Sequence, residues 1–162
     1  MKIAIYPGSF DPITLGHLDI IRRAAQCFDK VHVCVMINCD KKSPMFTPEE
    51  RLDLICRSVR DLPNVEAELW SGLLVDYAVK KEAYTLVKGV RNATDFDQEY
   101  QMAAINKGIC PQLETVFLPA SAAYQHFSST MVREMIRYHQ PLAQYVPAPV
   151  AQALSARREE NR

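Results

Sequence analysis

Short apolar segments alternate along this chain with longer segments of helical periodicity, and this alternation restricts the fold more than any other feature. The apolar segments cover residues 2–6, 31–37, 65–69, 85–88 and 115–118. Short apolar runs separated by helices are typical of strands in a parallel sheet that is covered on both faces. Crossovers between such strands are almost always right-handed. The sequence therefore predicts an α/β fold with five parallel strands, doubly wound, and helices on both faces.

Helices are expected between the strands, where apolar residues return every three or four positions. The clearest start is at Thr47, which can cap a helix with Pro48 at its first position and Glu50 completing a capping box. A later helix is expected to have Asp95 as its cap and Phe96 and Tyr100 on one apolar face. The other helices are expected from Thr14, around residues 74–78, after residues 128–130, and over residues 147–156.

Composition and charge limit the class of protein. With 162 residues, 48% of them hydrophobic, the chain suits one domain covering residues 1–162. Its 19 basic residues balance 19 acidic ones. Binders of duplex nucleic acid or anionic membranes normally carry a broad positive field, which this balance excludes. Any site for a polyanion must therefore be local, and neither nucleic acid nor membrane is expected as a partner.

The cysteines and the apolar runs point to a reducing compartment. The five cysteines are odd in number and form no C-x-x-C pair, so neither a disulfide framework nor a zinc site is expected. The longest apolar run, residues 31–37, is far shorter than the roughly 20 residues that span a bilayer. We therefore expect a cytoplasmic protein.

The loop after the first strand carries the strongest chemical signal. In doubly wound sheets ligands bind beyond the carboxyl ends of the strands, where the strand order reverses. Here Gly8 and Ser9 offer unhindered backbone N–H groups and a hydroxyl, and Gly16 and His17 place an imidazole in the first turn of a helix. The amino end of a helix favours an anion. The P-loop and dinucleotide fingerprints are absent, and a lone Gly-x-x-x-His elsewhere is more often a simple turn.

The complete sequence of this loop is a far more specific signal than the Gly-x-x-x-His spacing alone. Residues 8–12 followed by residues 14–17, Gly-Ser-Phe-Asp-Pro and Thr-Leu-Gly-His, resemble the signature of the T/HxGH nucleotidyltransferase superfamily. Within it the chain resembles the phosphopantetheine adenylyltransferase family in further segments, which keep the same order over nearly the full length: Lys41–Lys42, Pro44–Arg51, Gly89–Arg91, Asp95–Phe96, Glu99 and Ser128–Thr130.

This resemblance implies a Rossmann-like nucleotidyltransferase that moves AMP from ATP to 4'-phosphopantetheine, giving dephospho-coenzyme A and pyrophosphate. The acceptor phosphate would attack the α-phosphorus in line, without a covalent enzyme intermediate, so the protein would position the substrates and neutralise charge. Mg²⁺ would arrive mainly on the ATP phosphates, and no protein metal cage is expected. The resemblance also implies a homohexamer and makes coenzyme A a candidate feedback ligand.

The resemblance assigns catalytic roles to His17, Lys41 and Arg91. His17 would donate a hydrogen bond to the α-phosphate, and Arg91 would contact the ATP phosphates. Ser43 looks like an inserted residue, so Lys42 remains an alternative to Lys41 as the phosphate-binding lysine.

Other positions would bind the two substrates. Lys88 stands where the family more often has arginine, and it keeps the charge without the bidentate fork. The resemblance assigns acceptor contacts to Ser9, Lys41, Leu74 and Lys88. It assigns ATP contacts to Ser9, Phe10, His17, Gly89, Val90, Arg91, Glu99, Tyr124, Gln125, His126, Phe127, Ser128, Ser129 and Thr130.

Two other functions stay open at this point. One is a different T/HxGH nucleotidyltransferase whose acceptor is nicotinamide mononucleotide or a phosphoalcohol. The other is a non-catalytic sensor of nucleotide or coenzyme A, against which the intact His17, Lys41 and Arg91 argue.

Overall fold

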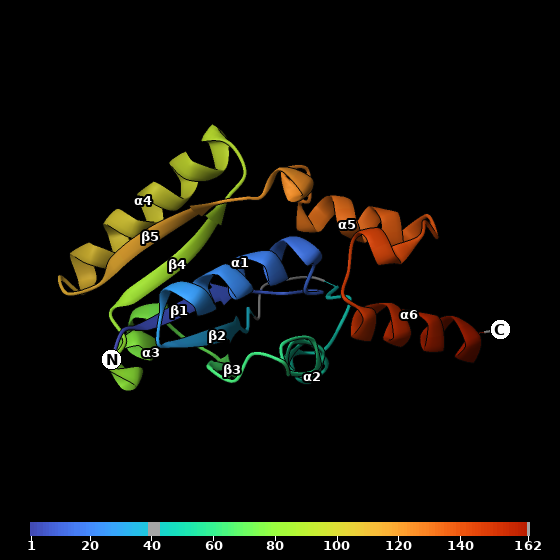
Figure 1. Ribbon diagram of the computed structural model, residues 1–162, viewed down its shortest axis with the longest axis horizontal. Coiled ribbons are helices and arrows are strands. Elements are labelled where there is room, and N and C mark those ends of the chain that lie inside the picture. The colour runs from blue at the N-terminus through green and yellow to red at the C-terminus, as the bar shows by residue number, and fades with distance from the viewer. Residues whose placement is uncertain (39–42, 162) are drawn as a thin grey trace.

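Five parallel strands form the centre of the molecule. The computed structural model describes residues 1–38 and 43–161 (Figure 1). The strands are β1 (Ile3–Gly8), β2 (Lys30–Met36), β3 (Val65–Trp70), β4 (Thr85–Val90) and β5 (Glu114–Pro119). Their order is β3-β2-β1-β4-β5, with every neighbouring pair parallel. This arrangement confirms the predicted doubly wound sheet.

Helices cover both faces of the sheet. Helices α1 (Leu15–Cys27) and α2 (Pro48–Ser58) pack on one face, while α3 (Leu74–Lys81) and α4 (Ala93–Ile109) pack on the other. Beyond the carboxyl ends of the strands lie α5 (Ser129–Arg137) and α6 (Ala148–Glu160), which join the α1 and α2 layer (Figure 1). A short 3-10 turn, η1 (Ala122–Tyr124), lies between β5 and α5, and a second, η2 (Leu142–Gln144), lies between α5 and α6. None of the described helices is both long and apolar enough to cross a membrane.

Two reciprocal capping boxes fix the starts of the helices nearest the first loop. Thr47 accepts a hydrogen bond from the Glu50 N–H and its own N–H donates to the Glu50 carboxylate, as predicted. Thr14 makes the same arrangement with His17 in place of the acidic residue. Both boxes satisfy backbone donors that a helix start leaves without partners.

The predicted cap of α4 is wrong. Asn92, not Asp95, is the N-cap, and its side chain accepts the hydrogen bond of the Asp95 N–H. The Asp95 carboxylate is instead held by the Arg91 guanidinium four residues earlier. Both side chains suit a helix start, and the nearby arginine decides between them because it engages the carboxylate.

The core has two parts, one on each face of the sheet. The larger lies between the sheet and helices α1, α2, α5 and α6, and the smaller lies under α3 around Tyr77. Helix α4 buries none of its residues in this single chain, and its predicted apolar face at Phe96 and Tyr100 is 45% and 58% exposed.

Candidate active site

A pocket of about 260 Å³ opens at the carboxyl ends of β1 and β4. These two strands pair at Ile5 and Leu86, and the strand order reverses between them. This is where doubly wound sheets bind ligands. The pocket is lined by Tyr6, Pro7, Gly8, Thr14, Gly16, His17, Ile20, Lys88, Gly89, Arg91, Asp95, Glu99, Ala120, Tyr124, Phe127, Ser128 and Ser129.

His17 is held in one orientation by the cap of its own helix. The Thr14 backbone N–H donates to His17 Nδ1 at 3.1 Å, and the Phe10 ring packs edge-on against the imidazole, with centroids 5.1 Å apart. Burial and then the positive charge of Arg91 lower the pKa of His17 to about 4. The imidazole is therefore neutral at pH 7. Because Nδ1 accepts a hydrogen bond, the proton is on Nε2, which can donate to a ligand.

Two cationic side chains at the end of β4 are each paired with a carboxylate of α4. Lys88 Nζ lies 3.1 Å from Glu99 Oε2. The Arg91 guanidinium donates to Asp95 through Nε at 2.9 Å and through Nη2 at 3.1 Å. An anionic ligand would compete with these carboxylates for the same donors. Lys88 and Arg91 are therefore neutralised by carboxylates in this structure. Their positive charge becomes available to a ligand when these ion pairs separate.

Gly89 lets the backbone of β4 approach α1 closely. A Cβ atom at this position would lie 3.0 Å from Ile20 Cγ1 and 3.2 Å from Cδ1. Real Cβ atoms are rarely found at such distances, so a side chain here would require the Ile20 side chain to shift by a few tenths of an ångström.

The segment between η1 and α5 forms the opposite wall. The rings of Tyr124 and Phe127 pack with centroids 5.4 Å apart, and Phe127 also packs against Tyr145. Ser128 caps α5 by accepting the Met131 N–H at 2.9 Å. The amino end of α5 therefore faces the pocket through Ser128 and Ser129.

The structure brings together most of the predicted site residues. His17, Lys88, Gly89, Arg91 and Glu99 line the pocket, as do Tyr124, Phe127, Ser128 and Ser129. Lys41 and its alternative Lys42 lie outside the described residues.

The remaining predicted residues lie near the pocket or away from it. Phe10 is 3% exposed and packs behind His17, with Ser9 beside it. Leu74 packs partly buried against the core under α3. The others, Val90, Gln125, His126 and Thr130, are adjacent in sequence to lining residues but are not among them.

Several lining residues were not predicted to bind substrate. Asp95 is the most informative, because its spacing of four from Arg91 is the signal that could have identified the ion pair. The others supply the walls and floor: Tyr6, Pro7, Thr14, Gly16, Ile20 and Ala120. Gly8, whose backbone N–H was expected to face a phosphate, also lines the pocket.

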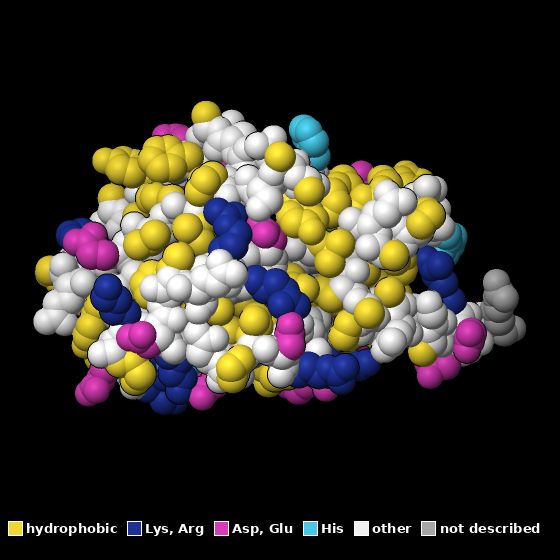
Figure 2. All heavy atoms as spheres, viewed as in Figure 1, with side chains coloured by type: hydrophobic (Ala, Val, Ile, Leu, Met, Phe, Trp, Pro, Cys, Tyr) yellow, Lys and Arg dark blue, Asp and Glu magenta, His cyan; other side chains and the backbone are white. Residues whose placement is uncertain are grey.

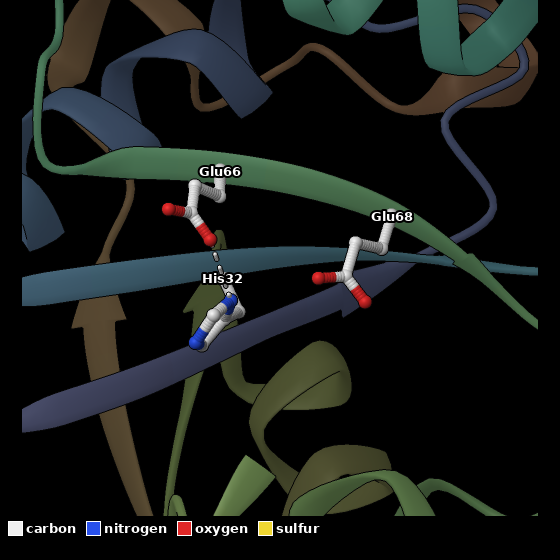
Figure 3. Close-up of side chains that lie close together, drawn as sticks. All are labelled: His32, Glu66 and Glu68. Carbon is white, nitrogen blue, oxygen red and sulfur yellow. Dashed lines mark ion pairs between the residues drawn. The ribbon is translucent and has the colours of Figure 1, made fainter.

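A second polar cluster lies between β2 and β3 (Figure 3). His32 pairs in register with Glu66, and Glu68 follows two residues later on the same face, so their ligand atoms lie within 4.8 Å of one another. The two carboxylates already have ammonium partners: Lys30 contacts Glu66 at 2.9 Å, and Lys81 contacts Glu68. Burial and then the charge of Lys81 lower the pKa of His32. The cluster is thus a balanced ion-pair network beside a neutral imidazole.

Comparison with known proteins identifies the family to which this chain belongs. A family model described as cytidylyltransferase-like matches residues 5–135. The phosphopantetheine adenylyltransferase of Alkaliphilus metalliredigens (strain QYMF) is 47% identical over 155 residues, covering 96% of this chain and 98% of that protein. That of Synechococcus sp. (strain JA-3-3Ab) is 50% identical, covering 96% and 97%.

A solved structure supports the fold. A putative nicotinate-nucleotide adenylyltransferase from Vibrio parahaemolyticus superposes with a TM-score of 0.68 at 20% identity, covering 96% of this chain and 93% of that one. At that identity the likeness concerns the fold alone. The near-full-length relatives go further, and together with the family model they establish that this chain belongs to the phosphopantetheine adenylyltransferase family of cytidylyltransferase-like enzymes.

Proposed function

We propose that this enzyme transfers the adenylyl group of ATP to 4'-phosphopantetheine. The observation that carries the proposal is the neutral imidazole of His17, oriented with Nε2–H available, beside Lys88 and Arg91 in the pocket at the strand-order reversal. The names of the near-full-length relatives support the choice of both substrates.

The reaction needs no nucleophile from the protein. An oxygen of the acceptor phosphate forms the new bond to the α-phosphorus, and the bond from that phosphorus to the α,β-bridging oxygen breaks. Pyrophosphate leaves with the electron pair, and dephospho-coenzyme A is formed. His17 Nε2–H would donate to the α-phosphate oxygen whose charge grows in the transition state, where such a donor is most effective.

The ion pairs of the pocket would exchange partners as substrates bind. The acceptor phosphate would take Lys88 from Glu99, and the ATP phosphates would take Arg91 from Asp95. A carboxylate released in this way can accept hydrogen bonds, and Glu99 would then be free to contact the adenosine. The energy of each phosphate contact is reduced by the ion pair that it replaces, which favours reversible binding.

Magnesium fits this pocket as part of the nucleotide. The two carboxylates that line it, Asp95 and Glu99, are each paired with a cationic side chain. Mg²⁺ keeps several waters and commonly binds substrate phosphates with few protein ligands. It would supply charge neutralisation on the phosphates, while the residues named above orient them.

A direct assay tests the proposed reaction. Purified protein with Mg-ATP and 4'-phosphopantetheine is expected to release pyrophosphate and dephospho-coenzyme A in equal amounts. Turnover with nicotinamide mononucleotide or a phosphoalcohol instead would identify a different acceptor. Tight nucleotide binding with no pyrophosphate from any acceptor would favour a sensor. Coenzyme A contains the product's own groups, so we expect it to compete with substrates in the same assay.

We also propose that helix α4 is covered by another copy of the chain in a homohexamer. Hydrophobic side chains gather over the region of α4 (Figure 2). Five large ones on this helix are between 45% and 58% exposed: Phe96, Tyr100, Met102, Ile105 and Ile109. Several large apolar side chains exposed on one helix are unusual for a monomer and commonly mark a protein interface.

Mass measurement tests the assembly. Light scattering coupled to size exclusion is expected to give six times the mass of the chain, and Ile109→Glu is expected to give smaller species, because a buried unpaired charge is costly. Val79→Glu, on the neighbouring helix α3 and 51% exposed, is the matched control. A monomeric wild-type chain would contradict the proposal.

A further inference from the structure

The guanidinium of Arg51 is buried beneath the first loop, and it pairs with no carboxylate of the described residues. Arg51 is on α2 and only 6% exposed. Its Nη1 donates to the backbone carbonyl of Ser9 at 2.9 Å, while its buried Nε has no acceptor among residues 1–38 and 43–161. In the described ranges 1–38 and 43–161, no carboxylate lies within 4.0 Å of it. A buried arginine normally has an anionic partner, because removing its charge from water is expensive.

The contact fixes the orientation of one peptide group in the loop. In a planar trans peptide the C=O and the following N–H point in opposite directions. Because the Ser9 carbonyl points at Arg51, the Phe10 N–H points away from it. Phe10 N–H donates to no acceptor within the described part of the chain. Arg51 therefore holds in place a donor that is open to an acceptor beyond the described residues.

The loop conformation needs such support. Phe10 has φ 50°, in the left-handed region that an aromatic residue rarely adopts. On the next residue, the buried Asp11 carboxylate accepts the N–H groups of Met45 and Phe46 at 2.9 and 2.8 Å. Arg51 and Asp11 thus hold the loop on either side of Phe10, and among the described residues only Arg51 contacts the peptide that presents the Phe10 N–H.

We propose that Arg51 is a positioning residue for nucleotide binding. Its hydrogen bond fixes the orientation of the Ser9–Phe10 peptide, so that the Phe10 N–H donates to a phosphate oxygen of ATP. The buried positive charge of Arg51 also polarises this peptide and so strengthens the Phe10 N–H as a donor. Without the hydrogen bond from Arg51, the peptide could rotate and turn the Ser9 carbonyl oxygen toward the phosphate. This inference rests on the proposed function, since it takes ATP as the anion.

The test compares two arginines of the same helix. Arg51→Met removes the charge and keeps much of the volume, and Arg51→Lys keeps a charge and one donor. Arg57→Met is the control, because Arg57 is exposed and pairs with Asp53. We expect Arg51→Met to lower kcat/KM for ATP on the order of 10²-fold, as loss of an oriented backbone donor does elsewhere. Arg51→Lys should recover part of this loss, and Arg57→Met should stay close to wild type.

Two further measurements separate positioning from folding. Thermal unfolding identifies the temperature at which each variant is folded, and Mg-ATP titrations are made below it. The amide resonance of Phe10 should shift strongly when Mg-ATP binds the wild type and much less in Arg51→Lys. A variant with a lower Tm but wild-type ATP affinity and amide shift would overturn the proposal. An inactive wild type whose Phe10 amide still responds to Mg-ATP would refute the proposed reaction and retain this inference.

Discussion

His17 has three properties that matter for the site: it is the second residue of a capping box, its imidazole is neutral, and its ring faces the pocket. The Thr14 N–H occupies Nδ1 and so selects the tautomer with a proton on Nε2. The lowered pKa of His17 follows from burial and from Arg91, so the cation that we propose binds phosphate also helps to keep the imidazole neutral. A neutral donor can respond to charge that develops only in the transition state.

Replacing His17 should therefore affect turnover more than binding. We expect His17→Ala to lower kcat on the order of 10²–10³-fold, the usual cost of losing one transition-state donor. The dissociation constant for Mg-ATP, measured by calorimetry, should change much less. His139→Asn serves as the control, because His139 follows α5 outside the pocket and Asn tolerates its positive φ of 56°. Equal losses in binding and turnover would contradict the assigned role.

The sequence identifies individual residues of the site but not the side chains with which they pair. His17, Lys88 and Arg91 were all predicted to lie in the site, and the structure brings all three to one pocket. Their pairing with Thr14, Glu99 and Asp95 was not predicted. A motif identifies residue types, whereas a hydrogen bond depends on side-chain rotamers and on the direction of the chain after each strand.

Helices α1 and α2 both begin with a reciprocal capping box, but the second residue of each box makes different contacts. In both, a threonine and the residue three positions later satisfy each other's backbone N–H groups. In α2 the second residue is Glu50, which also pairs with Arg157 of α6. In α1 it is His17, whose ring faces the pocket. Local capping rules therefore predict where both helices begin, while only the surroundings distinguish their functions.

The two caps make a matched pair of mutations. Thr14→Ala and Thr47→Ala should each lower the free energy of unfolding by about 1 kcal/mol, the typical cost of a lost N-cap. Only Thr14→Ala should also lower kcat, because Thr14 Oγ1 lies 3.2 Å from His17 Nδ1 and helps to hold the ring. Urea unfolding and steady-state kinetics on both variants provide the measurement. Equal kinetic effects would show that the Thr14 hydroxyl does not orient His17.

For the molecule as a whole, two histidines, the buried His32 and the partly buried His17, link stability to pH. The pKa values of His17 and His32 are lowered in the folded protein, that of His17 to about 4. Below about pH 6.5, the ordinary pKa of histidine, the unfolded chain binds protons that the folded chain resists. Stability should therefore fall as the pH drops from 6.5 toward 4, in addition to any effect of carboxylates.

Comparing variants isolates this contribution. The free energy of unfolding in urea, measured at pH 7, 6 and 5, should depend less on pH in the double variant His17→Asn, His32→Asn than in wild type. His139→Asn is the reference for loss of a histidine elsewhere. A slope unchanged in the double variant would show that these imidazoles titrate alike in both states.

The sequence by itself determined the order of strands and helices, the capping box of α2 and the motif that places the chain in its family. These follow from periodicity, capping chemistry and residue types, which act over a few neighbouring positions. The tertiary structure alone decided which groups distant in sequence meet: Lys88 with Glu99, and Arg51 with the Ser9 carbonyl. Such contacts depend on sheet order, helix packing and rotamers, which local patterns do not encode because the free energy that selects them comes from the whole packed molecule.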